Sequence, residues 1–228
     1  MNTMQEKIHA LFKNHGIFMK VDKDSKIFLE GECAEEIFYI VSGTIQISQE
    51  TENGKELTIR ICGPASIIGE GSLFCHLSYN SVTAKVLEPS TLYVLSRTSM
   101  EQLLAAQPSM MVEYLKWLQI ENFKHQSRLR DLVLHGKKGA LFSTLIRLTN
   151  TYGKPLDDGA IVIDLRLTNL ELANLCGTSR EMINRMLNDL KKHHILSFDK
   201  GYITIYNLKF LKDEIACENC PVQICRID

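Results

Sequence analysis

Residues 168–192 read TNLELANLCGTSREMINRMLNDLKK, and this stretch predicts two short helices joined by a tight turn. Thr168 precedes Glu171 by three residues, and Thr178 precedes Glu181 by the same spacing. A Thr followed three residues later by Glu is a capping box, which satisfies the free amide groups at a helix start. The two boxes predict helices over 168–176 and 178–192.

The residues between these helix starts indicate a helix-turn-helix. Ala173 is small where the helices would cross, Gly177 suits a left-handed turn, and Ile183 would anchor the second helix in the core. Residues 195–206 follow as a predicted hairpin with its turn at 199–201, so the motif is of the winged type. The apolar face is completed by Leu172, Leu175, Met186, Leu187 and Leu190.

The exposed start of the second helix is a candidate DNA-binding surface. The first residues of a recognition helix meet base edges in the major groove, where Arg can bind guanine and Glu can accept from cytosine. Two alternatives stay open: Glu181 only closes its capping box, and the arginines contact phosphate or solvent. The candidate DNA-binding residues are Ser179, Arg180, Glu181, Asn184 and Arg185, with Thr168 on the first helix.

The residues before the motif complete a domain over 136–216, with a helix over 138–151, a loop over 152–159 and a strand over 161–165. This domain carries 12 Lys and Arg against 9 Asp and Glu, whereas residues 1–135 carry 13 against 16. The basic balance agrees with a domain that faces nucleic acid, although many solvated surfaces have a similar balance.

A long helix is predicted over 109–134, which contain neither Gly nor Pro. A heptad-like series of residues runs along it at alternating steps of four and three. Such a seam is typical of a coiled coil and predicts a homodimer, because one helix cannot bury the seam alone. The alternative is a helix that packs on its own β-domain. The predicted interface residues are Met111, Leu115, Leu118, Asn122, His125, Leu129 and Leu132.

Residues 21–97 have the pattern of an all-β barrel or sandwich. Short runs rich in Ile, Val, Tyr and Phe alternate with Gly, Asn and Pro. Asn53-Gly54 predicts a hairpin turn, because both residues tolerate positive φ. Residues 1–18 predict an amphipathic helix with Ile8, Leu11 and Phe12 on one face. Strands are predicted over 26–30, 36–41, 44–49, 57–61, 81–87 and 91–96.

The composition is that of a globular protein with one large or two modest domains. The 228 residues are 45% hydrophobic and 23% charged, which excludes a wholly disordered or collagen-like chain. No apolar run approaches the ~20 residues of a membrane span, and the N-terminal residues lack an apolar signal core. No P-loop, dinucleotide fingerprint or Ser-His-Asp order supports an enzyme. We therefore expect a cytoplasmic protein that is not an enzyme and has no membrane partner.

Three of the seven cysteines, Cys217, Cys220 and Cys225, fall within nine residues near the C-terminus. Cytoplasmic thiols stay reduced, so a disulfide framework is not expected, and the other four cysteines are expected to be small buried side chains. Three cysteines plus His193 or His194 would make a structural zinc set. A trio of redox-active thiols is another alternative.

The chain resembles the CRP/FNR family of bacterial transcription regulators along nearly its whole length. Gly69-Glu70 and Leu73-Phe74 match the family's β-roll, and Arg180-Glu181 with Arg185 match its recognition helix. The resemblance implies a homodimer that binds a TGTGA-like inverted repeat in DNA and contacts RNA polymerase. It also implies an α+β fold: a cyclic-nucleotide-binding-like β-roll over 1–108, a dimerisation helix over 109–135, a winged helix-turn-helix domain over 136–216 and a tail over 217–228.

One departure from the family concerns its best-known ligand. Family members that bind cyclic nucleotides follow Gly-Glu with Arg-Ser or Arg-Thr, and this Arg holds the cyclic phosphate. The corresponding residues 76–84, HLSYNSVTA, contain neither Arg nor Lys. A buried phosphate without a guanidinium partner would be an uncompensated charge, so we expect no cAMP binding.

The tail resembles that of the Bacillus type of FNR protein, which binds a [4Fe-4S] cluster through C-terminal cysteines and an aspartate near the end of the dimer helix. Asp131 is the matching residue. The resemblance implies one cluster per subunit, held by Cys217, Cys220, Cys225 and Asp131, and a response to oxygen. Asp131, close to Arg128 and Arg130, could instead be only a surface ion-pair partner. The alternative function is a regulator of the same fold that senses an organic effector in the β-roll and holds structural zinc in its tail.

Overall fold

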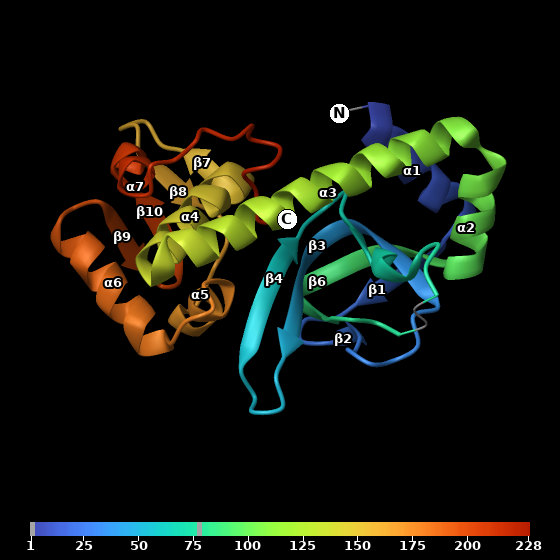
Figure 1. Cartoon of the computed structure of the whole chain (residues 1–228), viewed down its shortest axis with the longest axis horizontal. Coiled ribbons are helices and arrows are strands. Elements are labelled where there is room, and N and C mark those ends of the chain that lie inside the picture. Colours follow the sequence, from blue (N-terminus) through green and yellow to red (C-terminus); the bar gives the residue numbers. More distant parts are fainter. Residues whose placement is uncertain (1–2, 77–78) are drawn as a thin grey trace. The chain divides into compact units, whose positions relative to one another are not determined.

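The computed structural model describes residues 3–76 and 79–228, and it describes side chains from residue 6 onward. The expectations for residues 1–2, and for residues 77–78 within the stretch 76–84, lie outside the described residues. The chain divides into two compact units (Figure 1). One comprises residues 1–55, 59–118 and 228, and the other comprises residues 56–58 and 119–227.

The first unit is built on an antiparallel sheet in the order β1-β6-β3-β4, with β2 beside β6 and β5 beside β3. The predicted Asn53-Gly54 hairpin is confirmed, because the amide of Thr51 donates to the carbonyl of Lys55 at 2.9 Å between β3 and β4. The elements are α1 (Thr3–His15), β1 (Ile17–Val21), β2 (Lys26–Phe28), β3 (Glu36–Glu50), β4 (Glu56–Cys62), β5 (Ile67–Ile68), the short 3₁₀ helix η1 (Glu70–Ser72), β6 (Thr83–Ser96), α2 (Arg97–Ala106) and the start of α3 (Pro108–Leu134).

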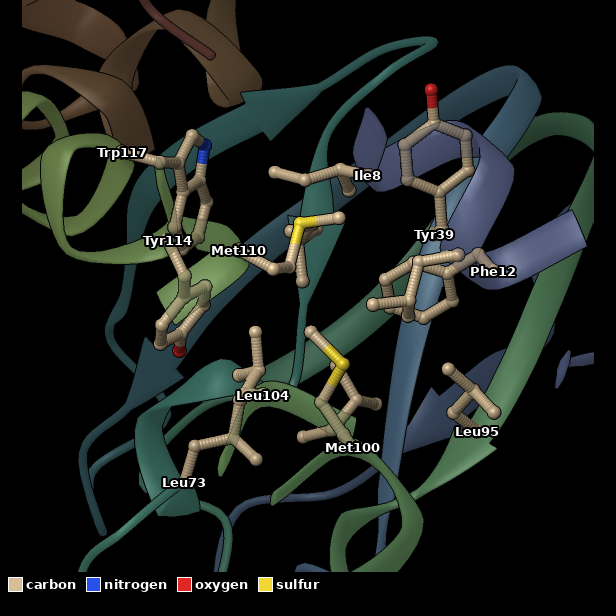
Figure 2. Packing of buried hydrophobic residues seen from close by; sticks show 13 residues of the cluster. Ile8, Phe12, Tyr39, Leu73, Leu95, Met100, Leu104, Met110, Tyr114 and Trp117 are labelled. Carbon is tan, nitrogen blue, oxygen red and sulfur yellow. The ribbon is translucent and has the colours of Figure 1, made fainter. Parts of the chain in front are cut away.

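The sheet has a different apolar cluster on each of its faces. Along β3, Ile37 and Tyr39 belong to one cluster and Phe38 to the other, because successive side chains of a strand point to opposite faces. The first cluster also contains residues of α1, α2 and α3. Figure 2 shows Tyr114 and Trp117 of α3 in this cluster, where their rings stack with centroids 5.7 Å apart. Helices therefore cover one face of the sheet.

Two features of this unit differ from the prediction. The first helix ends at His15 rather than at residue 18, because β1 begins at Ile17 and pairs with β6. The breaks that the sequence predicts within β3 and β6 are bulges in continuous strands. Gly43 at one bulge has φ 94°, and a Cβ there would lie 2.1 Å from Oγ of Ser90. Glycine thus lets the strand continue through the close approach.

The second unit contains the remaining helices and a small sheet in the order β7-β8-β10-β9. The helix predicted over 138–151 and the hairpin predicted over 195–206 are confirmed, whereas β7 lies in a predicted loop and α7 was not predicted. The elements are α4 (Gly136–Tyr152), β7 (Gly153–Pro155), β8 (Ile161–Ile163), α5 (Asn169–Leu175), α6 (Arg180–Lys192), β9 (Leu196–Asp199), β10 (Tyr202–Ile205) and α7 (Leu208–Glu214).

The core of the second unit surrounds α4, whose residues 139–149 are all buried. Apolar side chains from α5, α6, the sheet and α7 complete this core, and Ile183 of α6 and Ile203 of β10 are fully buried in it. The α+β fold, with an N-terminal β-domain, a long helix and a C-terminal helix-turn-helix, is therefore as predicted.

Candidate DNA-binding surface and candidate metal site

The helix-turn-helix consists of α5, a short turn and α6, as the sequence predicts. Thr168 caps α5 in a complete capping box: its hydroxyl accepts from the Glu171 amide at 3.2 Å, and the Glu171 carboxylate accepts from the Thr168 amide. Gly177 in the turn has φ 57°, and Ala173 and Ile183 are buried. All three turn and core roles predicted for these residues are confirmed.

The prediction of a second capping box, with Thr178 as the N-cap, is wrong by one residue. The N-cap of α6 is Ser179, whose hydroxyl accepts from the amide of Met182 at 3.3 Å. The amide of Thr178 still donates to the carbonyl of Ala173 at 3.0 Å, so this residue belongs to the turn. Glu181 consequently closes no box, and its side chain is free of that role.

The residues that were predicted on the second helix lie on the exposed side of α6 near its N-terminus, with Ser179 as its N-cap, whereas Thr168 caps α5. Arg180, Glu181 and Arg185 are exposed, and so is Asn184, whose amide oxygen accepts from Asn169 of α5 at 3.2 Å. Hydrogen bonding from its own backbone amide and from Ser179 lowers the pKa of Glu181, so this side chain is a carboxylate at neutral pH. The helix start therefore presents two guanidinium groups and one carboxylate.

Two basic residues that sequence reasoning did not single out lie where the wing, the hairpin of β9 and β10, meets the segment before α5. The amide of Leu167 donates to the carbonyl of Gly201 at 2.8 Å, which ties the wing to the segment before α5. Arg166 and Lys200 are exposed at this junction. Their signal in the sequence was only their charge, and charge alone does not distinguish them from solvated surface residues.

The predicted dimer seam on α3 divides into two parts. Met111 and Leu118 are half-buried against the first apolar cluster, and Leu132 is also half-buried. Leu115 and Leu129 are 55% and 62% exposed. Asn122 and His125 are exposed, and further exposed apolar side chains on α3 are Val112, Phe123 and Val133.

The helix therefore packs on its own β-domain through a face that the prediction did not name, formed by Met110, Tyr114 and Trp117. It also leaves apolar side chains exposed along α3, which we call the α3 strip. Leu115 and Leu129 of this strip belong to the predicted seam, whereas Val112, Phe123 and Val133 each lie one position after a seam residue. The homodimer stays a prediction, and Leu115 and Leu129 are the apolar seam residues that are exposed and so available for it.

Asp131, the predicted fourth cluster ligand, is a buried ion-pair partner rather than a surface one. It is 5% exposed. Its Oδ2 accepts from Oγ of Ser143 at 2.5 Å and from Nη2 of Arg147 at 2.6 Å. Its Oδ1 accepts from Nε and Nη2 of Arg130 at 3.1 and 2.9 Å. Burial would raise the pKa of Asp131, but these hydrogen bonds outweigh it and lower the pKa, so the group is ionised.

Arg147, in the middle of α4, joins Asp131 to the tail. Its side chain is 3% exposed. Besides Asp131, Nη2 donates to Oγ of Ser127 at 2.9 Å, and Nη1 donates to the carbonyl of Ile224 at 3.3 Å. Sequence reasoning missed this residue, because it lies 16 positions after Asp131 and only the fold brings the two together.

The cysteine tail is held against the second unit at both ends. The amide of Cys217 donates to the carbonyl of Lys212 on α7 at 2.9 Å. The carbonyl of Cys225 accepts from Nδ2 of Asn150 on α4 at 2.8 Å. Beyond it, Ile227 is buried, and its amide donates to Oγ1 of Thr151 at 3.0 Å. The tail is thus an ordered part of the domain.

The three tail thiols are free, half-buried and close enough to influence one another electrostatically. Burial raises the pKa of the Cys225 thiol, the nearby Arg147 opposes this rise, and the neighbouring thiols of Cys217 and Cys220 add to it. The four other cysteines divide evenly: Cys62 and Cys176 are buried as expected, whereas Cys33 and Cys75 are exposed.

Arg130 connects the tail to Asp131. It forms an ion pair with Glu218, and its guanidinium is hydrogen-bonded to both Asp131 and Cys220, which raise its pKa. The three thiols, with Arg130 and Arg147 beside them, fit the chemistry of a thiolate-bound metal centre, whose net negative charge two guanidinium groups would offset.

No three His, Cys, Asp or Glu side chains within residues 6–76 and 79–228 are arranged to hold one metal ion. Among these residues, the tail cysteines therefore form no ready-made site for a single ion, either with His193 or His194 or with Asp131. Nor does any described helix have the length and apolar character needed to cross a membrane.

Comparisons with known proteins agree with this architecture. The family model of the cyclic nucleotide-binding domain matches residues 18–107, and that of the Crp-like helix-turn-helix domain matches residues 140–214. The chain is 43% identical over 222 residues to the "Anaerobic regulatory protein" of Bacillus subtilis, which covers 97% of this chain and 93% of that protein. It is 26% identical over 212 residues to the "Global nitrogen regulator" of Synechocystis, covering 90% and 94% of the two chains.

Solved structures with low sequence identity share the fold. The c-di-GMP responsive global regulator CLP of Xanthomonas campestris superposes with a TM-score of 0.77 at 21% identity, over 88% of this chain and 98% of that one. FixK2 from Bradyrhizobium japonicum gives a TM-score of 0.75 at 16% identity, over 87% and 96%. The fold, the helix-turn-helix and the sequence match together place the protein: the chain belongs to the CRP/FNR family of DNA-binding transcription regulators, which are not enzymes.

Proposed function

We propose that this protein is a cytoplasmic, homodimeric transcription regulator that responds to oxygen through a [4Fe-4S] cluster in its tail. The observation that carries the proposal is the grouping of three free thiols beside Arg130, near the end of α3, and Arg147 of α4. The relative from Bacillus subtilis, named an anaerobic regulatory protein, supports the same reading at 43% identity.

The residues have separate tasks in this proposal. The three tail thiolates would each hold one iron, and Asp131 would provide the fourth ligand. When bound, the cluster supplies a redox centre whose state depends on oxidants. Asp131 lies near the end of α3 and the cysteines lie on the tail. A cluster bound by both would therefore join the dimer helix to the tail of the DNA-binding domain. Binding would then favour one arrangement of these elements over others, which is a population shift.

Anaerobic reconstitution with iron and sulfide tests the cluster, with Cys220→Ser as the variant. The matched control is Cys33→Ser, which removes an exposed thiol outside the tail. The parent chain and the control should bind about four irons per chain, show the visible absorption of a cluster and bleach in air. Cys220→Ser should bind none. A protein that instead retains about one zinc per chain, without visible absorption or any response to air, would support the structural-zinc alternative and overturn the proposal.

The DNA target is proposed to be an inverted repeat of TGTGA-like half-sites, read by the exposed start of α6. Arg180→Ala should weaken binding to the specific operator by about 1–3 kcal/mol and relax the preference at one base pair. Lys191→Ala, which removes a positive charge from the other end of the same helix, is the control and should affect specific and random DNA alike. Equal losses on both DNAs for Arg180→Ala would contradict base reading.

We also propose that the β-roll binds no cyclic nucleotide. Glu70 accepts from Nη2 of Arg60 at 2.5 Å, and the two side chains are only 15% and 8% exposed, so this carboxylate already has a cationic partner. Trp117, the single tryptophan, packs in the same unit and is a natural reporter. Its fluorescence should not change on titration with cAMP, and a saturable change would contradict the proposal.

A further inference from the structure

The acceptor positions of Asp131 are fully used. A carboxylate offers about four lone-pair sites, and four donor atoms reach this one, two at each oxygen. A metal ion that takes Asp131 as a ligand must therefore displace one of the present donors. Which donor leaves decides how readily the ligand becomes available.

The two guanidinium groups differ in how easily they can leave. Arg147 is 3% exposed, and its remaining partners are the neutral Ser127, Ser143 and Ile224, so without Asp131 it would be a buried charge with no counter-ion among them. Arg130 is 31% exposed and also contacts Glu218 and Cys220. It can release Asp131 and keep both an anionic partner and access to water.

We infer that Arg130 occupies the metal-binding position of Asp131, so that its guanidinium and the metal compete for Oδ1. Arg147 and Ser143 position the carboxylate through Oδ2 whether or not metal is bound. The exchange breaks one ion pair and forms one metal–oxygen bond, and the Arg130–Glu218 pair stays intact. Arg130 thereby sets how firmly the fourth ligand holds. This inference rests on the proposed function, because it takes Asp131 as a ligand of the [4Fe-4S] cluster.

The test compares Arg130→Gln with Arg147→Gln in the full-length chain. Lys137→Gln is the control, because it removes one positive charge from an exposed residue in the first turn of α4. Two quantities are measured: the thermal unfolding midpoint of the cluster-free protein, and the half-life of the reconstituted cluster in anaerobic buffer with a fixed concentration of iron chelator. Arg130→Lys, which keeps the charge but not the forked geometry, is a second variant that should lie between Arg130→Gln and the parent.

If Arg130 competes with the metal, Arg130→Gln should change the unfolding midpoint and the cluster half-life in opposite directions. Arg130→Gln should lower the unfolding midpoint of the cluster-free protein slightly and lengthen the cluster half-life by up to about fivefold, the range expected for a partly exposed pair. Arg147→Gln should lower the midpoint more and shorten the half-life, because the carboxylate loses its positioning partner. A purely structural role for Arg130 would shorten the half-life as well.

The outcomes separate this inference from the function it rests on. If the parent chain holds a cluster and Arg130→Gln loses it as fast as the parent or faster, the competition is refuted while the proposed function stands. If the parent chain binds no iron and sulfide at all, the proposed function fails and the inference fails with it. If Asp131→Ala and the parent have the same cluster and the same half-life, Asp131 is not a ligand, and competition at Oδ1 is refuted.

Discussion

The buried pair between Asp131 and Arg147 should contribute strongly to the stability of the cluster-free protein. The two side chains are 7% and 3% exposed and lie 2.6 Å apart. Removing one partner of such a pair leaves a buried charge without its counter-ion, which costs about 3–5 kcal/mol. Asp131→Asn should lie at the upper end, because Arg147 then retains only neutral partners. Arg147→Met should lie at the lower end, because Arg130 still neutralises the carboxylate.

Urea unfolding, followed by circular dichroism at one fixed chain concentration, measures these losses. The double variant Asp131→Asn/Arg147→Met should lose less stability than the two single variants combined. With both side chains neutral, no buried charge of this pair remains without its counter-ion. Arg130→Gln is the matched control and should cost about 1 kcal/mol or less, since its side chain is 31% exposed. Single-variant losses below that of Arg130→Gln, or strictly additive losses in the double variant, would refute the reasoning.

Three further predictions follow from other parts of the molecule. Ser179→Ala should lower the unfolding free energy by about 1 kcal/mol in thermal melts, whereas Thr178→Ala should not lower it through loss of a cap, because Ser179 is the N-cap of α6. Leu115→Asp should give monomers in sedimentation experiments and weaken operator binding, and dimers that persist would contradict the assignment of the α3 strip. Burial raises the pKa of the Cys176 thiol to about 12, so mass spectrometry should find it unalkylated in the native protein while the exposed Cys33 reacts.

The helix-turn-helix could be predicted from sequence because its determinants are local. Gly177, Ala173 and Ile183 lie within eleven positions of one another, and each has a steric role that the residue type itself reveals. The error at the second cap arose where two adjacent residues, Thr178 and Ser179, both carry a hydroxyl. The local sequence pattern cannot decide which of the two is the N-cap. The hydrogen bond from the Thr178 amide back to α5 decides it, because it places Thr178 in the turn.

The parts that the sequence did not reveal depend on distant partners. The strand Ile17–Val21 pairs with Ser90–Val94, and the paired residues lie 69 to 77 positions apart along the chain. The hydrogen-bond partners of Asp131 also include residues that are distant in the sequence. Arg130 was visible as a neighbour, but Arg147 and Ser143 come from the next helix, and only packing shows that they meet the carboxylate. A resemblance could single out Asp131 as a candidate ligand, yet it could not show that its acceptor positions are taken.

The anchoring of the tail at both ends affects how a metal centre there would be assembled. Cys217 is fastened to α7 and the residues after Cys225 to α4, so the loop between them keeps its thiols at a high effective concentration. The conformational entropy of bringing these ligands together is then lost when the chain folds, and little of it remains to be lost on binding. If the tail binds iron as proposed, release of the metal would leave the thiols in place, which would favour repeated loading and unloading without refolding of the domain.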